Sequence, residues 1–214
     1  TAAKSKFMRF GENPILQPTL ELSWQNRCVF NPAAIYLDGK VHILYRAQSM
    51  DGTSVVGYAS SKDGLHIDEN LPDPIYMPRE PFEIKDHPIG NSGCEDPRIA
   101  QIGNKIYMTY TAYDGKHPPR VAMTSITVEE FLQKKWYWER PKLISLPDTD
   151  DKDACIVQGK DNTYFAFHRM GVEIWLDITY DLYFHEGRYI TGKILARPRP
   201  GKWDSVKIGI AGPP

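Results

Sequence analysis

An all-β fold built from repeated four-stranded units is predicted by three features of the sequence. Three segments can be laid over one another as β-hairpins. Each hairpin is followed by a third strand, a polar turn and a fourth element, so the pattern recurs every ~50 to 65 residues. Helical periodicity is slight and is confined to TVEEFLQKKW (127–136), where we expect a short helix.

The hairpin segments begin at Asn31 (NPAAIYLDGKVHILYRA), Asp96 (DPRIAQIGNKIYMTYTA) and Asp153 (DACIVQGKDNTYFAFHRM). Each has a short apolar run, a polar turn and an aromatic-rich strand, which is the chemistry of a β-hairpin. The turns are Asp38-Gly39, Gly103-Asn104 and Asp161-Asn162. The equivalent hairpins expected from this alignment, each in its own sheet, are 31–46, 96–111 and 153–169.

Four strands per repeat of this length are typical of a β-propeller blade. The third and fourth elements are expected in 55–67, 120–138 and 174–190, and the Pro-containing stretches 71–89 and 140–149 as connections. A fourth repeat would open at Lys207, so the 214 residues make three blades and the start of another. We therefore expect one β-propeller domain over 1–214, truncated at its C-terminus. A β-sandwich is the alternative, which the long period disfavours.

Composition excludes several classes of function. The net charge of −1 gives no support for binding nucleic acid or an anionic membrane, and 41% hydrophobic residues suit a soluble globular protein. No apolar run approaches the ~20 residues that span a bilayer. Cys28, Cys94 and Cys155 are odd in number and widely spaced, which argues against a disulfide scaffold or a zinc site. They fit buried filler in a reducing cytosol, so a cytoplasmic location is expected.

The repeat predicts a shared polar site. The start of the first strand of an antiparallel hairpin lies beside the end of the second. In a propeller such ends from every blade meet at one mouth of the central channel. A polar, charged funnel of this kind is a candidate binding site. The residues expected to gather there are Asn31, Arg46, Asp96, Asp153, His168 and Arg169.

The quartet Glu95-Asp96-Pro97-Arg98 lies at this mouth. Strand alternation predicts that Glu95 and Asp96 point to opposite faces and that Asp96 shares a face with Arg98. Pro97 favours an extended backbone at Asp96. Carboxylates and cations so placed would suit sugar hydroxyls. The plainer alternatives are a turn or cap aspartate at Asp96 and a structural ion pair for Arg46 or Arg169, with pairing of both arginines less expected.

Several stretches then resemble glycoside hydrolase family 130, the inverting β-mannoside phosphorylases and their hydrolytic relatives, which fold as five-bladed β-propellers. They run in the family's order over 31–214: NPAAIYLDGKVHILYRA, GCEDPRI, YTAYDG, KDACIVQGKDNTYFAFHR and WDSVKIGIAGPP. The resemblance implies that three to four of the five blades are present. It also implies inorganic phosphate as co-substrate, with no other cofactor and no metal.

The resemblance implies that Asp96 is the catalytic acid, acting through a sugar hydroxyl in the phosphorylases. Strand alternation lets only one of the two carboxyls face the channel, so Glu95 is expected to be a support. The resemblance also implies sugar contacts by Asn31 and Arg46. Tyr110 and Tyr113 are the aromatic candidates for sugar contact, and Tyr113 is favoured because it is expected beyond the strand end. The substrate-binding residues expected are Asn31, Arg46, Glu95, Arg98, Tyr113 and Asp153.

Phosphorolysis also accounts for basic residues. An inverting hydrolase needs an acid and a second carboxylate, whereas phosphate arrives as an anionic nucleophile and needs cations to hold it. The phosphate-binding residues expected are Arg140, Lys160, His168 and Arg169. Without the resemblance, Lys160 would be taken for a solvated turn lysine.

The leading hypothesis is therefore an enzyme, a glycoside phosphorylase (glycosyltransferase) that converts β-mannosides of mannooligosaccharide or mannosyl-glucose type and phosphate into α-mannose 1-phosphate. A β-mannosidase, with Asp153 or Glu173 as the second carboxylate, and a non-catalytic carbohydrate-binding propeller are the alternatives. The sequence leaves the linkage (β-1,4 or β-1,2), the acceptor sugar and the oligomeric state open, a homo-oligomer included. We do not expect turnover by these 214 residues alone.

Overall fold

The structure, a computed structural model, describes residues 8–185 and 187–212, which form twelve strands, a 3-10 helix (Ser23–Gln25) and one α-helix, α1 (Val128–Leu132). The first four strands are β1 (Cys28–Leu37), β2 (Lys40–Gln48), β3 (Thr53–Ser61) and β4 (Glu69–Asn70). The next four are β5 (Ser92–Ile102), β6 (Lys105–Tyr113), β7 (Arg120–Thr127) and β8 (Lys142–Leu143). The last four are β9 (Asp151–Gln158), β10 (Tyr164–Met170), β11 (Glu173–Thr179) and β12 (Lys193–Ala196).

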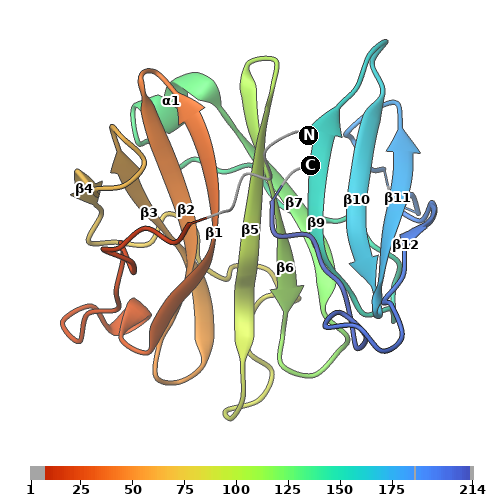
Figure 1. Cartoon of the computed structure of the whole chain (residues 1–214), viewed down its shortest axis with the longest axis horizontal. Helices are drawn as coiled ribbons and strands as arrows, with labels where there is room; N and C mark the ends of the chain where they lie inside the picture. The colour runs from red at the N-terminus through yellow and green to blue at the C-terminus, as the bar shows by residue number, and fades with distance from the viewer. Residues whose placement is uncertain (1–7, 186, 213–214) are drawn as a thin grey trace.

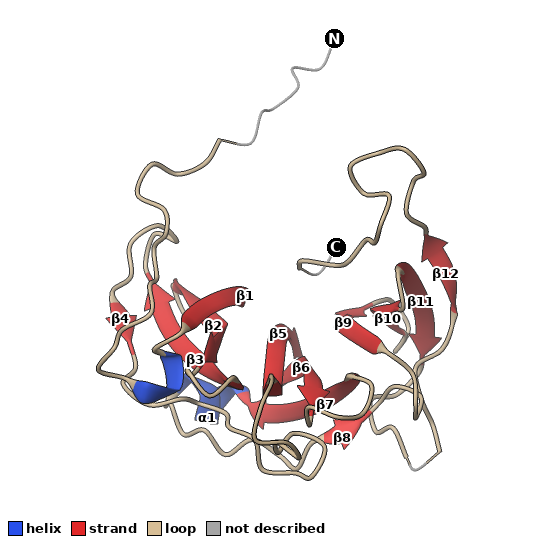
Figure 2. Ribbon diagram, turned by 90° about the horizontal axis from the view of Figure 1, so that it is seen from below, coloured by secondary structure: helices blue, strands red, loops and turns tan. Residues whose placement is uncertain are grey.

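Each set of four consecutive strands pairs antiparallel in chain order, as expected of propeller blades. The three sets lie side by side (Figure 1) and follow an open arc with β1, β5 and β9 on its inner side (Figure 2). The three expected hairpins are confirmed as β1–β2, β5–β6 and β9–β10. The described residues form an arc and no closed ring. The expectation of a mere connection at 140–149 was wrong in part, because β8 lies there and pairs with β7.

The first two sets share one sheet, where we expected separate sheets. Strands β3 and β5 run parallel over only two residue pairs, Thr53 with Ser92 and Ser54 with Gly93. Gly93 is required at this joint, since its φ is +108° and a Cβ there would lie 2.2 Å from the carbonyl oxygen of Ser54. The hairpins themselves do not pair with each other.

The helix expected at 127–136 is shorter than expected. Thr127 caps α1, and its side chain and that of Glu130 form the reciprocal bonds of a capping box. The helix stops before Lys134, which has a φ of +56°. Within the described residues, no helix combines the length and the apolar character needed to cross a membrane.

A fourth repeat is not formed by the described residues. The stretch 207–212 contains no strand and instead turns into the arc (Figure 2). The carbonyl of Ile210 accepts a hydrogen bond from Arg98 Nη2 at 3.2 Å, and the amide of Ile208 donates to the carbonyl of Val172 at 3.2 Å. The stretch 207–212 therefore lies against β5 and the β10–β11 turn.

Two apolar cores hold the sets together. The first contains Leu44 and Tyr58 from the first set and Met108 from the second. The second contains Val121 from the second set and Ala166 from the third. The three cysteines are free: Cys94 and Cys155 are buried and Cys28 is half-buried. Burial of apolar area between neighbouring sets is thus the main cohesion of the arc.

A buried carboxylate fixes the connection between β4 and β5. Glu83 is completely buried, and its Oε2 accepts hydrogen bonds from the backbone amides of Arg79 (2.8 Å) and Glu80 (2.9 Å). Its Oε1 accepts from the hydroxyls of Tyr76 (2.9 Å) and Tyr110. Four donors on one carboxylate compensate for its desolvation. No periodic pattern in the sequence marks this anchor.

We predict that Glu83→Gln lowers the free energy of unfolding by about 2–4 kcal/mol, because the new NH₂ group must face either two amide donors or two hydroxyls. Urea unfolding measures this loss. The matched control is Glu129→Gln at an exposed position of α1, expected within about 0.5 kcal/mol of the parent. Equal effects of the two changes would show that Glu83 is no anchor.

Candidate active site

The inner strands share one backbone irregularity at the residues that open the three repeats. Asn31, Asp96 and Asp153 have φ values of +46°, +51° and +56°. At each of them the ladder between the inner strand and its neighbour shifts register, which is a β-bulge. Asn and Asp tolerate this left-handed conformation better than other residues with side chains. The conformation explains why these residue types stand at the start of each repeat.

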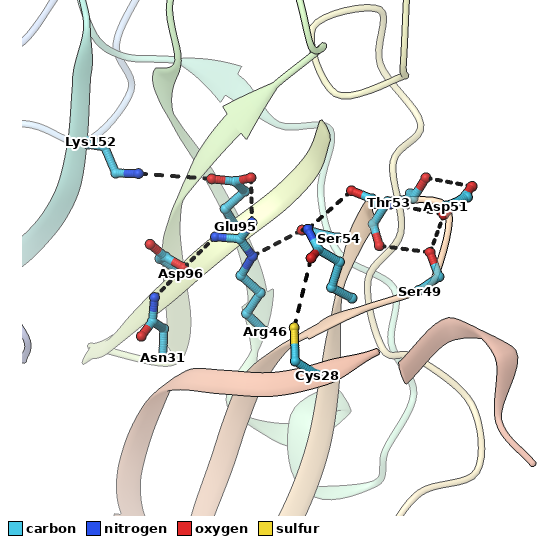
Figure 3. A network of polar contacts seen from close by, with 12 residues as sticks. Cys28, Asn31, Arg46, Ser49, Asp51, Thr53, Ser54, Glu95, Asp96 and Lys152 are labelled. Carbon is cyan, nitrogen blue, oxygen red and sulfur yellow. Dashed lines mark hydrogen bonds and ion pairs between the residues drawn. The ribbon is translucent and has the colours of Figure 1, made fainter. Parts of the chain in front are cut away.

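The bulge overturns two expectations about the quartet. Asp96 is left-handed, so the extended backbone expected from Pro97 was wrong. Glu95 and Asp96 do not point to opposite faces, because the bulge interrupts the alternation of side chains. Both carboxylates reach the same guanidinium group, that of Arg46 (Figure 3).

Arg46 is the centre of this contact network. Its Nη2 lies 2.6 Å from Glu95 Oε1 and its Nη1 lies 3.0 Å from Asp96 Oδ1. Its Nε donates to the hydroxyl of Ser54 at 3.0 Å, and the guanidinium lies 4.6 Å from the ring centroid of Phe30. All three charged side chains are only 8% exposed. The geometry is that of a buried cation shared by two carboxylates.

Asn31 joins the first set of strands to this cluster. Its Nδ2 donates to Asp96 Oδ1 at 2.8 Å, across 65 residues of sequence. The expected proximity of Asn31, Arg46 and Asp96 is thus confirmed by their contacts. Among the described residues, Asp96 Oδ2 has no hydrogen-bond partner, so this oxygen is available to a ligand.

The two carboxyls differ in electrostatic environment. Burial disfavours the charged form of Asp96, but the Asn31 amide and the Arg46 guanidinium outweigh it and hold the pKa of that carboxyl below its ordinary value. Burial raises the pKa of Glu95, and neighbouring Asp96 adds to the rise, while Arg46 and Lys152 offset only part of it. Glu95 therefore accepts a proton more readily than Asp96 in the free site.

Lys152 is a site residue that our sequence reasoning missed. Its Nζ lies 3.9 Å from Glu95 Oε2, and its side chain is 21% exposed (Figure 3). In the ladder of the third set, Lys152 pairs with Arg169. The equivalent pairs are Glu95 with Thr111 in the second set and Phe30 with Arg46 in the first. The position before each left-handed residue thus faces the cluster, and the repeat could have identified Lys152 by this rule.

Arg98 forms no hydrogen bond or ion pair with Asp96 among the described residues, although the two were expected to share a face. Its Nη1 donates to the carbonyl of Pro97 at 2.8 Å and its Nη2 to that of Ile210. Arg169 pairs with Asp153, with Nε and Oδ2 2.7 Å apart. Both Arg46 and Arg169 are therefore in ion pairs, although pairing of both was the less expected outcome.

The four residues expected to bind phosphate do not form one cluster in the described structure. The side chain of Arg140 is 83% exposed and binds Glu80 through two nitrogens at 3.0 Å each. Lys160 is exposed in the β9–β10 turn, at the opposite end of that hairpin from Arg169. His168 is buried, with Nδ1 2.8 Å from Asp151 Oδ2 and Nε2 3.1 Å from the carbonyl oxygen of Thr191. Of the four, Arg169 alone pairs with Lys152 in the described ladder.

Tyr110 and Tyr113, the two candidates for sugar contact, lie in different environments. Tyr110 is buried and its hydroxyl binds Glu83, so it belongs to the core. Tyr113 is half-buried and is the last residue of β6, opposite Gly93 in the ladder, rather than beyond the strand end as expected. This position is three residues along β5 from Asp96.

Comparison with known proteins gives the family. The profile of glycoside hydrolase family 130, described as β-1,4-mannooligosaccharide phosphorylase, matches residues 8–214, and the chain belongs to this family. It is 31% identical to a 1,2-β-oligomannan phosphorylase and 33% identical to a β-1,2-mannobiose phosphorylase, both from Thermoanaerobacter sp. (strain X514). Each match covers 98% of this chain, which spans 67% and 68% of the two relatives.

A solved structure agrees with the family assignment. It comes from work on family 130 glycoside hydrolases that target β-1,2 mannosidic linkages in Candida mannan. The TM-score is 0.73 at 26% identity, over 92% of this chain and 62% of the other. The chain thus spans less than two thirds of that protein.

We predict opposite effects of the two carboxyls on stability. The pKa of Asp96 is lowered on folding, so its ionised form adds stability above the ordinary pKa near ~4, and this is lost as the pH falls through the folded value. Asp96→Asn should therefore destabilise at about pH 7 and much less at about pH 3. The pKa of Glu95 is raised, so its charge costs stability at neutral pH, and Glu95→Gln should be neutral or stabilising there. Urea unfolding at both pH values tests this, and a greater loss for Glu95→Gln at neutral pH would contradict it.

Proposed function

We propose that the protein cleaves β-mannosides by inverting phosphorolysis, with α-mannose 1-phosphate as a product. The observation that carries the proposal is that Asn31 and Arg46 both bind Asp96 Oδ1, with Asn31 and Asp96 on matching bulges and Lys152 near Glu95. The two named phosphorylase relatives support the reaction class and favour a β-1,2 linkage in the substrate. Inorganic phosphate is the co-substrate.

Asp96 is the general acid in this proposal. Its Oδ1 is held by Asn31 and Arg46, which leaves Oδ2 to deliver a proton, directly or through a sugar hydroxyl. A bound sugar excludes water and competes for the Asn31 amide, and both effects raise the pKa of Asp96 toward the range in which it carries a proton. The glycosidic C–O bond then breaks as the leaving oxygen takes that proton.

Phosphate attacks the anomeric carbon from the opposite face, so the configuration inverts and no second catalytic carboxylate is needed. A cation must hold the dianionic phosphate on that side. Lys152 and Arg169 are the candidates, because they pair in the ladder next to the acid cluster. Arg169 is held by Asp153 at 2.7 Å, whereas Lys152 lies 3.9 Å from Glu95, so Lys152 is the stronger candidate.

The hydrolytic alternative is less well supported. It requires a second carboxylate free to activate water. Asp153 is bound by Arg169 at 2.7 Å, and Glu173 is bound by Arg197 Nε at 2.9 Å. Both candidates are therefore engaged with guanidinium groups. A non-catalytic binding protein would need no acid, and it is excluded by any turnover that depends on Asp96.

A product assay on the full-length protein separates the three hypotheses. With β-1,2-mannobiose, we expect mannose 1-phosphate to form only when phosphate is added. Mannose release that does not depend on phosphate would instead identify a β-mannosidase. Binding without either product would identify a carbohydrate-binding protein.

Substitution of the two carboxyls tests the assignment of the acid. Asp96→Asn keeps the shape and removes the proton, so turnover should fall by ~10²-fold or more while sugar binding persists. Glu95→Gln is the matched control and should retain most of the activity. Near-normal turnover in Asp96→Asn with loss in Glu95→Gln would assign the acid to Glu95, the carboxyl with the raised pKa.

A pair of lysine substitutions tests the phosphate site. Lys152→Met removes the charge and keeps the length, and we expect the KM for phosphate to rise by about tenfold with little change in the KM for the sugar. Lys160→Ala, in the exposed β9–β10 turn, is the control. A larger effect on the phosphate KM from Lys160→Ala would restore the phosphate site expected from the sequence.

A further inference from the structure

A cavity of about 330 Å³ lies between the second and third sets of strands, away from the acid cluster. Lys105 and Tyr107 at the start of β6 line one wall, and Tyr164 at the start of β10 lines the other. The loop 180–183 after β11 forms the rim. The volume is at the lower end of the range of ligand pockets, sufficient for one or two sugar rings.

The cavity is at the opposite end of the strands from Asp96. Lys105 pairs with Ile102 at the β5–β6 turn, and Ile102 follows Asp96 by six residues on β5. At ~3.3 Å per residue, this end of the strand lies about 20 Å from the acid. A short oligosaccharide bound at Asp96 does not reach the cavity, so the two places are separate.

Four tyrosines line the cavity: Tyr107, Tyr164, Tyr180 and Tyr183. Tyr180 and Tyr183 are 70% and 68% exposed, although aromatic rings normally bury most of their area. An aromatic face packs well on the C–H groups of a sugar ring, and the phenol hydroxyls can bond to the hydroxyls at its edge. Exposed rings around a polar cavity are therefore suited to a carbohydrate.

The rim is held in place before any ligand binds. Lys142 Nζ donates to the carbonyl of Tyr183 at 2.7 Å, and the amide of Tyr183 donates to Asp181 Oδ1 at 3.0 Å. Asp181 in turn is paired with Arg188. The ring of Tyr183 stacks on that of His185 with centroids 6.1 Å apart. A fixed rim reduces the entropy lost on binding.

Of the charges that line the cavity, Lys142 alone lacks a carboxylate partner among the described residues, and its Nζ donates to the carbonyl of Tyr183. The other lining charges are in ion pairs. Lys105 pairs with Glu139 at 2.5 Å, and Arg140 pairs with Glu80. With Asp181 already bound by Arg188, the cavity offers no concentrated positive or negative field. This balance favours a neutral ligand with many hydroxyl groups over an anion such as phosphate.

We propose that this cavity is a second, non-catalytic binding site for a neutral mannooligosaccharide. The ligand class rests on the proposed function, whereas the existence of a carbohydrate site rests on the tyrosines, the volume and the charge balance. A site about 20 Å from the acid would keep a longer mannan chain on the protein between cleavage events.

The test is an NMR titration of the full-length protein, labelled on its tyrosine rings, with β-1,2-mannotriose. We expect the signals of Tyr107, Tyr164, Tyr180 and Tyr183 to shift together, and Tyr183→Ala to weaken this binding by about tenfold. Tyr180→Ala, the second variant, should do the same. Turnover of β-1,2-mannobiose should be unchanged in both. Tyr36→Ala, which removes an equally exposed tyrosine on β1, is the control.

Unmoved tyrosine signals at ligand concentrations that saturate turnover would overturn the proposal, as would equal weakening by Tyr36→Ala. Equal binding of cellotriose would overturn the assignment to mannosides. If the protein shows no phosphorolysis but the four signals still shift, the proposed function fails and this site stands.

Discussion

Three left-handed residues determine how the inner strands present their side chains. Asn31, Asp96 and Asp153 each occupy a β-bulge with positive φ, a conformation that costs most residues of order 1–3 kcal/mol and that Asn and Asp tolerate better. At Asp96 the bulge turns two successive carboxylates toward one guanidinium. Regular alternation would have placed one of them in the apolar core. The candidate active site therefore depends on a backbone conformation before it depends on any charge.

Arg46 contacts both carboxyls of this site, whose pKa values shift in opposite directions. It bonds to both carboxylates, yet only Asp96 also receives the Asn31 amide, and this lowers the pKa of Asp96 while burial raises that of Glu95. The same contacts connect the first two sets of strands, because Asn31 and Arg46 come from β1 and β2 and Asp96 from β5. The same cluster thus connects the first two sets of strands and lowers the pKa of Asp96. A substitution in it is therefore expected to affect both the stability of the arc and the acid.

Much of the arrangement could be predicted from the sequence, because turn chemistry and strand length recur in each repeat. The three hairpins and the proximity of Asn31 to Asp96 follow from that pattern. The orientation of Glu95 could not be predicted from alternation, since a bulge inserts a residue that the 2-residue period does not contain. Contacts between distant turns, such as those of Glu83 and Arg140, leave no periodic signal in the sequence. For this reason the sequence could not show that Arg140 is paired with Glu80.

The most direct test is a ¹³C NMR titration of the side-chain carboxyls of Glu95 and Asp96 in the ligand-free protein, assigned with Glu95→Gln and Asp96→Asn. If the bulge places both groups on Arg46 and Asn31 holds only Asp96, then Asp96 titrates below its ordinary pKa and Glu95 above its own. Ordinary values for both carboxyls, or the reverse order, would contradict the shared contact on which this account of the site rests.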